Sequence, residues 1–416
     1  MDKKKIQLQR TFGSCWGVGF SVSVIGAGIS VAPGGVPKSC ANGVSLWTRA
    51  GCALLPRTAL CRAEMRVTLP CRGAHYHFLR RCFGNLISFL SLWPASLLGP
   101  GLAASQALLL AECSIQPFPS CSAPKLPKKC LALAAPRTVG ILNPRGVKEV
   151  TWLQITSTTL KAILGLNFLS GAVLLVRGGK QNVDIFNLFN AEFPEASQFI
   201  EAIFPGYVAY SGGGCVTFIA DAVAVTWMDR VIPSMQWAIS IGVSSSIVSS
   251  LNCTVFSTSR LWYMASQQGQ LPLIFSTLNI QSCPIVAVIQ MLIFASILII
   301  PSDLILLINY VGFTDSAWMM TGLLKLRYQE PHLSRPYKVR LPFVFGTIAM
   351  SLFLVLTPVI KSPQMHHIYV LLFILSGLLF YLPFVHFSLG STYFNKITCF
   401  LQLLFNVSPA DDTDEC

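Results

Sequence analysis

Charged residues are scarce in this chain, and their scarcity argues against a soluble fold. They make up 11% of its 416 residues, whereas hydrophobic residues make up 53%. A soluble globular domain is usually about one-quarter charged. Stretches without any charge recur along the sequence, and a stretch of about 20 apolar residues is enough for a helix to cross the bilayer core. The composition therefore predicts a membrane protein.

The charge-free stretches predict helices rather than barrel strands, because they lack a two-residue alternation and contain glycine and proline freely. Two further stretches carry one charge each, 150–176 with Lys161 and 304–324 with Asp315. The charge-free ones are 11–37, 82–111, 202–220, 231–259, 283–302, 341–360 and 362–395. We predict an all-α polytopic membrane protein.

The predicted organisation is one membrane domain between two tails. Residues 1–10 are predicted to form a cytoplasmic N-terminal tail, 11–387 the transmembrane domain, and 388–416 a C-terminal tail. The net charge of +13 collects in short segments between apolar stretches. That pattern sets membrane orientation and does not indicate a nucleic-acid partner.

Sequence signatures of catalysis and of metal binding are also missing. The 14 cysteines form no CxxC pair, and the six histidines include no HExxH motif. Nothing resembles a P-loop or a nucleophile elbow. We expect no enzymatic activity, no catalytic residues, no metal site and no cofactor.

The basic segments predict which loops face the cytoplasm, and this prediction disagrees with the number of spans in the sequence. Residues 57–81 carry six arginines against Glu64, and 325–340 carry five basic residues against Glu330, so both are expected in the cytoplasm. Residues 177–201, with four acids and two bases, are expected outside. An odd number of crossings must separate 177–201 from 325–340, but the sequence offers four. We predict a deleted span close to Ala220; a re-entrant stretch is the alternative.

Two glycine clusters interrupt apolar stretches, at 25–29 (IGAGI) and 210–214 (YSGGG). Broken helices at corresponding places in two halves are the sequence feature that best indicates a transporter site. Amides at a half-helix N-terminus can hold a carboxylate, and carbonyls at a half-helix C-terminus can hold an ammonium. Close packing between helices is the alternative for each cluster taken alone.

Several polar features inside apolar stretches are interpreted without a functional role. Arg49, followed by Pro56, and Arg137, directly after Pro136, combine a charge with a helix breaker in short spans. We interpret them as damage to the second and fourth spans. Asn252 begins a glycosylation pattern, but it lies within a predicted span, so we expect it to be unmodified.

Six motifs resemble those of the glycoprotein-associated light chains of heterodimeric amino-acid transporters, within the amino acid-polyamine-organocation superfamily. The last three look closest to the family's sodium-independent aspartate/glutamate transporter. The resemblance covers most of the chain. The motifs are IGAGISVAPGGV (25–36), SIQPFPSCSAPKLPKK (114–129), GVKEVTWLQI (146–155), AYSGGG (209–214), FSTSRLWYMASQQGQLP (256–272) and KLRYQEPHLSRPYKV (325–339).

The resemblance implies a LeuT-like bundle with an inverted repeat, in which the two glycine clusters break spans one and six. It implies a substrate site whose backbone meets an amino acid at both charged ends. Gly26, Ala27 and Gly28 would meet the carboxylate. Val208, Ala209 and Ser211 would meet the ammonium, with Val208 standing where relatives have an aromatic gate.

The resemblance also implies a partner. Cys121 matches the cysteine with which such light chains form a disulfide to a type II membrane glycoprotein, the heavy chain. An odd external cysteine suits intermolecular pairing. A free loop thiol is the alternative.

One departure from the family affects the expected activity. The sequence runs from Phe218-Ile219-Ala220 straight into Asp221, which resembles the stretch before span eight, so about 11 spans remain and the seventh is missing. We expect a light chain descended from a sodium-independent exchanger of acidic amino acids or cystine, working by alternating access at the plasma membrane, with the apical surface as one candidate site. A non-transporting membrane or interaction protein is the competing hypothesis.

Overall fold

The computed structural model describes the chain in several ranges, and helices dominate them. A single pair of two-residue strands is the β structure in the described part. The described residues are 60–61, 64–65, 67–69, 74–115, 125–145, 149–160, 162–163, 166, 236–279, 283–300, 304–361, 365–386, 398–400, 402–405 and 407–409.

Most helices coincide with the stretches predicted from hydropathy. Residues 149–160 are helical as well. The main elements are α3 (Ala74–Phe83), α4 (Asn85–Ile115), α5 (Lys125–Leu142), the 3-10 turn η2 (Asn143–Arg145), α9 (Gln236–Gln267), the 3-10 turn η4 (Leu273–Ser276), β1 (Thr277–Leu278), α10 (Ile285–Ile299), α11 (Leu304–Gln329), α12 (Leu341–Lys361), α13 (Met365–Phe380), the π-helical turn η5 (Tyr381–His386) and β2 (Ser408–Pro409).

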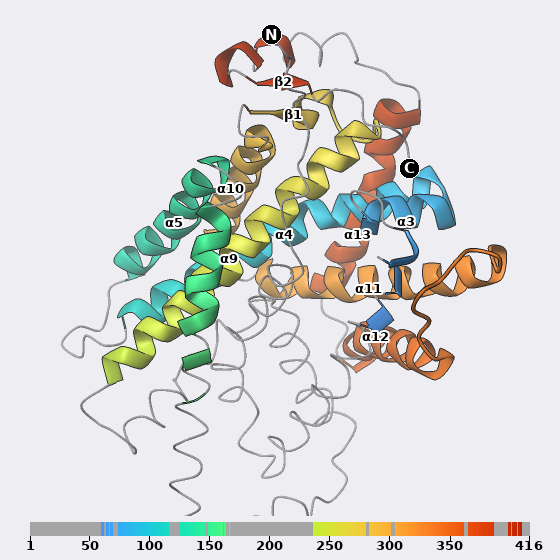
Figure 1. Ribbon diagram of the computed structural model, residues 1–416, viewed down its shortest axis with the longest axis horizontal. Helices are drawn as coiled ribbons and strands as arrows, with labels where there is room; N and C mark the ends of the chain where they lie inside the picture. Colours follow the sequence, from blue (N-terminus) through green and yellow to red (C-terminus); the bar gives the residue numbers. More distant parts are fainter. Residues whose placement is uncertain are drawn as a thin grey trace, which may run out of the picture.

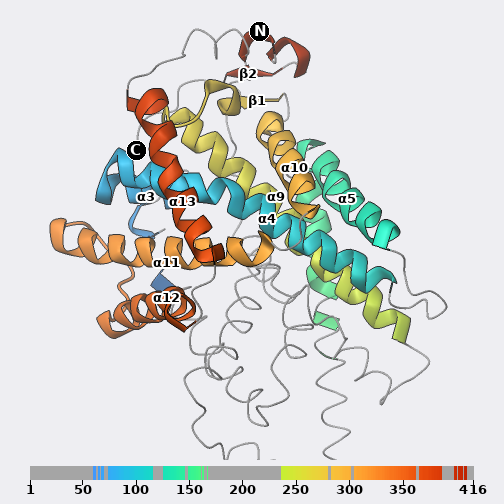
Figure 2. The same cartoon turned by 180° about the vertical axis from the view of Figure 1, so that it is seen from behind.

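Helix α4 is the centre of the described bundle. Among the residues whose side chains are described, it is the one helix long and apolar enough to cross a membrane by itself. Gly84, with φ 83°, separates α4 from α3. This left-handed conformation suits glycine, because a side chain would strain the backbone. In Figure 1 and Figure 2, α9 lies against α4, and α5 and α10 lie beside α9.

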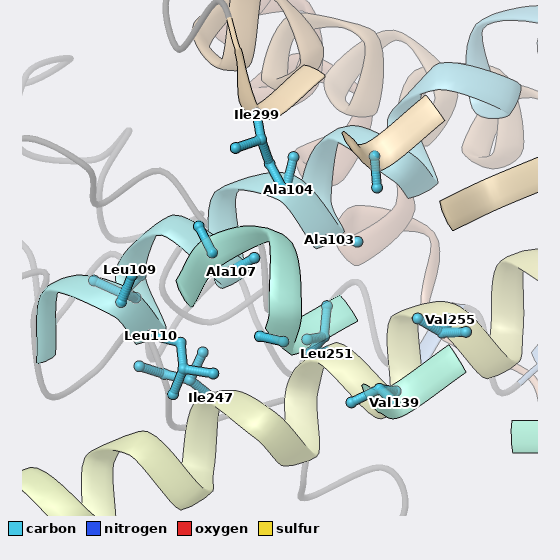
Figure 3. Close-up of a cluster of buried hydrophobic side chains, with 14 of the residues drawn as sticks. Ala103, Ala104, Ala107, Leu109, Leu110, Val139, Ile247, Leu251, Val255 and Ile299 are labelled. Carbon is cyan, nitrogen blue, oxygen red and sulfur yellow. The ribbon is translucent and has the colours of Figure 1, made fainter. Parts of the chain in front are cut away.

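The largest apolar cluster forms where α4, α5, α9 and α10 meet. Its side chains from α4 are small, with Ala103, Ala104 and Ala107 fully buried, and they meet Ile247 and Leu251 of α9. Figure 3 shows these side chains converging between the helices. Small residues let helix backbones approach closely, which strengthens packing where water cannot drive association.

A second cluster joins α3 to α11 and α12. Phe78 and Leu79 of α3 pack against Met320 and Leu323 of α11. Helix α13 packs against α4 separately: the Trp93 ring stacks on Phe380 with centroids 4.5 Å apart. Because each peripheral helix contacts α4 or a direct neighbour of α4, α4 organises the described helices.

The predicted interruption of the fourth span is wrong. Helix α5 continues from Lys125 to Leu142 through Pro136, and Arg137 lies exposed on its surface. Proline removes one backbone hydrogen bond, but neighbouring groups in a bundle can compensate. Helix α4 also continues through Pro94 and Pro100.

Candidate functional site

The residues predicted to contact substrate lie outside the described part of the chain. The same holds for the proposed heavy-chain cysteine and for the predicted deletion point at 220/221. These residues are Gly26, Ala27, Gly28, Cys121, Val208, Ala209 and Ser211. What the structure describes is a set of helices that bury several polar side chains among the apolar ones.

Helix α9 carries this polar interior. Ser249 and Asn252 have no exposed surface, and Ser246 and Ser250 have 3% or less. Polar groups buried in a membrane protein must find partners or incur a desolvation cost, so such positions are functional hypotheses by default. Sequence reasoning missed this feature, although Ser244-Ser245-Ser246 and Ser249-Ser250 stand out within a charge-free stretch.

Gln106 of α4 is the first hydrogen-bond partner of these buried polar residues of α9, which we call the polar stripe. Its Nε2 donates to Ser250 Oγ at 2.9 Å, and its Oε1 accepts a hydrogen bond from Thr254 Oγ1 at 3.3 Å. The Gln106 side chain is 2% exposed. A single amide thus satisfies two hydroxyl-bearing residues of α9 and fixes the register of α4 against α9.

Asn252 of α9 forms a second connection, to two other segments. Its Oδ1 accepts from Asn143 Nδ2 at 3.1 Å, and its Nδ2 donates to Val150 O at 3.4 Å and Gln154 Oε1 at 3.5 Å. The end of α5, the 149–160 helix and α9 therefore meet at one buried amide. A glycan has no access to a side chain with no exposed surface, which agrees with the expectation that Asn252 is unmodified.

Two buried hydroxyl groups of α9 have no hydrogen-bond partner among the described residues. Ser246 Oγ and Ser249 Oγ are buried and make no hydrogen bond within the described part of the chain. A hydroxyl can donate one hydrogen bond and accept two. Within the described residues, the pair therefore has hydrogen-bonding capacity that a polar solute or a water molecule could use.

At one end of the bundle, the two basic segments expected in the cytoplasm meet. Arg327 donates to both carboxylate oxygens of Glu64, with Nε to Oε1 at 2.9 Å. The pair also clamps Val339, whose N–H donates to Glu64 Oε2 at 2.8 Å and whose carbonyl accepts from Arg327 Nη2 at 2.7 Å. Arg81 and Glu330 form a second pair at 2.7 Å, more exposed than the first.

These contacts place Glu64 and Arg81 at the same end of the molecule as the 325–340 segment, as the charge pattern requires of two cytoplasmic segments. Within 325–340, only part of the basic charge remains available to solvent. Arg327 is paired, Arg335 donates to the carbonyls of Leu326 and Glu330, and Lys325 Nζ lies 4.9 Å from the centre of the Phe83 ring. Three of the five basic residues that predict the orientation of this segment therefore also make structural contacts.

Comparison with known proteins assigns this bundle to a family. The "Amino acid permease" family model matches residues 11–220 and 207–382. Solute carrier family 7 member 13 of Mus musculus is 51% identical, over all of this chain and 98% of the relative. The Homo sapiens protein of that name is 50% identical, with full coverage of both chains. The b(0,+)-type amino acid transporter 1 of Homo sapiens is 30% identical, over all of this chain and 96% of its own length. The chain therefore belongs to the amino acid permease family of multi-pass membrane transporters, and not to an enzyme family.

Proposed function

We propose that the chain is an amino-acid transporter light chain, built for sodium-independent exchange by alternating access. Family membership supports this proposal, and one structural observation carries it. The described bundle buries a stripe of polar side chains on α9, next to the bilayer-length helix α4, and leaves Ser246 and Ser249 without hydrogen-bond partners in the described part. Such a polar interior suits a pathway for a polar solute, because polar side chains at membrane depth are costly and usually serve a function.

The proposed site binds the two charged ends of an amino acid with backbone groups. Gly26, Ala27 and Gly28 would present amides to the carboxylate, and Val208, Ala209 and Ser211 would present carbonyls to the ammonium. The expected substrates are aspartate and glutamate, or cystine, because the motifs look closest to the aspartate/glutamate transporter of the family. The mechanism needs no covalent step, metal or cofactor.

The proposed partner is a type II membrane glycoprotein bound through Cys121. This cysteine lies between the end of α4 at Ile115 and the start of α5 at Lys125. Lys128 and Glu112 form an ion pair of 2.8 Å that joins the two helix ends on either side of Cys121 in the sequence. On a non-reducing gel, the chain should migrate with a heavy chain, and Cys121→Ser should abolish the shift while Cys130→Ser should not.

We further propose that the seventh span of the family is missing. The alignment with the mouse relative runs over 468 positions, so at least 52 of them, 468 less 416, hold no residue of this chain. A loop plus a span of about 20 residues fits that number. The first matched family segment also ends at residue 220, where the charge pattern predicts the deletion. The genomic sequence between the codons for Ala220 and Asp221 tests this: an open exon encoding a basic loop and an apolar span would support it.

Uptake of labelled amino acids, measured after co-expression with a heavy chain, tests the proposed function. We expect weak delivery to the plasma membrane and little uptake from the chain as it stands, because the loss of one span disrupts an inverted repeat. Insertion of the mouse relative's segment between Ala220 and Asp221 should restore exchange, and Gly28→Val in that chimera should abolish it.

If the chimera reaches the surface but transports no amino acid, the transporter proposal is wrong. The chain would then be a non-transporting membrane or interaction protein, the competing hypothesis. Robust exchange by the unmodified chain would instead contradict the expected effect of the missing span.

A further inference from the structure

The C-terminal tail folds back onto the loop between α9 and α10. Strand β2 (Ser408–Pro409) pairs antiparallel with β1 (Thr277–Leu278), with Thr277 opposite Pro409 and Leu278 opposite Ser408. Figure 1 shows this strand pair at one end of the bundle, above α10. More than 120 residues separate the two strands in the sequence, so the pairing is a tertiary contact.

An apolar contact anchors the strand pair. Val407, 7% exposed, packs with Ile274 of η4 and Val286 of α10, both buried. Its own N–H donates to Gln402 O at 3.1 Å, which folds the tail into a turn and directs the next residues toward β1. On the same turn, Leu403 is 80% exposed and takes no part in the contact. The tail therefore contacts the bundle through the face that carries Val407, and the face that carries Leu403 is exposed.

The loop that receives the tail is coupled to the centre of the bundle. Gln270 Nε2 donates to Asn85 O and to Ser88 Oγ, both at the start of α4 and both at 3.1 Å. Gln268 Oε1 accepts from Arg80 Nη1 of α3 at 3.2 Å. Anything that holds the loop in place thus also holds the ends of α4, α9 and α10 together.

We propose that the described tail residues 402–405 and 407–409 form a tail latch: an intramolecular ligand that adds a strand to β1 and packs Val407 against Ile274 and Val286. Strand addition supplies main-chain hydrogen bonds, and the side-chain pocket supplies selectivity. A two-residue strand pair is weak by itself, so the latch is reversible. Its release loosens the α9–α10 loop, which makes the tail a regulatory element of the bundle.

Disulfide trapping tests the position of the latch in the full-length chain. Residues paired directly across two strands lie within the distance that a disulfide can bridge. Leu278→Cys with Ser408→Cys should crosslink under mild oxidation, as detected by mass spectrometry of the joined peptides. Leu278→Cys with Leu403→Cys, the out-of-register control, should crosslink far less. Equal crosslinking of the two pairs would overturn the proposal.

Hydrogen exchange tests what the latch does, without any measurement of transport. Val407→Asp places a charge in an apolar pocket and should raise deuterium uptake in residues 273–283 several-fold, while Leu403→Asp should leave it unchanged. A synthetic peptide of residues 402–409 added to the Val407→Asp protein should restore part of the protection. Unchanged uptake in Val407→Asp would contradict the proposal, and the proposed transport function would be unaffected.

Discussion

Arg327 and Glu64, 263 positions apart in the sequence, form a buried ion pair between the end of α11 and the segment before α3. Their side chains are 8% and 0% exposed. The pair does more than neutralise charge, because both members also hydrogen-bond the backbone of Val339. The pair therefore fixes the loop between α11 and α12 against Glu64. Glu64 belongs to the 57–81 segment and the loop to the 325–340 segment, both of which the charge pattern assigns to the cytoplasm.

Replacing one member of this ion pair should strongly destabilise the folded protein. Glu64→Gln leaves the Arg327 guanidinium buried without its counter-charge, and breaking a buried pair costs about 3–5 kcal/mol. We expect a large fall in the melting temperature of the detergent-solubilised protein. Arg81→Gln is the matched control, because the Arg81–Glu330 pair is at least one-third exposed and exposed pairs contribute about 1 kcal/mol or less. Equal losses in the two variants would contradict the structural role of the Arg327–Glu64 pair.

Helix α4 should not tolerate a side chain at Gly99. A Cβ added there would lie 2.3 Å from Thr258 Oγ1 of α9, so Gly99→Ala forces α4 and α9 apart. Overpacking of this kind costs about 1–3 kcal/mol, measurable as a lower melting temperature. Thr258→Ala in the Gly99→Ala background should recover part of the loss. If the double variant is no more stable than Gly99→Ala alone, the close approach of α4 and α9 is wrong.

The two ends of the bundle should differ in accessibility. Ser334, exposed in the α11–α12 loop, lies in the predicted cytoplasmic segment 325–340. Lys129, exposed near the start of α5, follows Cys121, which is predicted to be external. In a background with all 14 native cysteines replaced by serine, Ser334→Cys should react with an impermeant maleimide only after permeabilisation. Lys129→Cys should react on intact cells. Labelling of Ser334→Cys from outside would show that the C-terminal half is inverted.

Acid should weaken the contact between α3 and the α9–α10 loop. Burial, and then the charges of Arg81 and Arg80, lower the pKa of His77 below its usual 6.5, and Gln268 Nε2 lies 3.5 Å from His77 Nδ1. Above pH 6.5 the ring is neutral in both the folded and unfolded states. Below it, the unfolded state takes up a proton first, so stability falls as pH falls.

His77→Gln removes the titrating group and keeps an amide at that position. Its melting temperature should therefore decline less than that of the unmodified protein between pH 7.5 and pH 5. Identical pH slopes would exclude His77 as a source of the acid sensitivity, since the titration of other groups is common to both proteins.

Composition alone determined the class of this protein. Lipid offers no hydrogen-bond partners, so long charge-free stretches must form helices, and α4, α9, α10, α11, α12 and α13 all lie largely within predicted stretches. The glycine clusters and the family resemblance predict a substrate site at named residues. That site remains a prediction, because its residues lie outside the described part of the chain.

Only the tertiary structure decided which polar groups meet. Nothing in the sequence pairs Glu64 with Arg327 or Asn143 with Asn252, and nothing in it docks Val407 on Ile274. The physical reason is that hydropathy depends on the residues within one segment, whereas a buried hydrogen bond depends on two segments brought together by packing. The same reason explains α5: Pro136 indicates a break within its own segment, and the bundle around it keeps the helix intact.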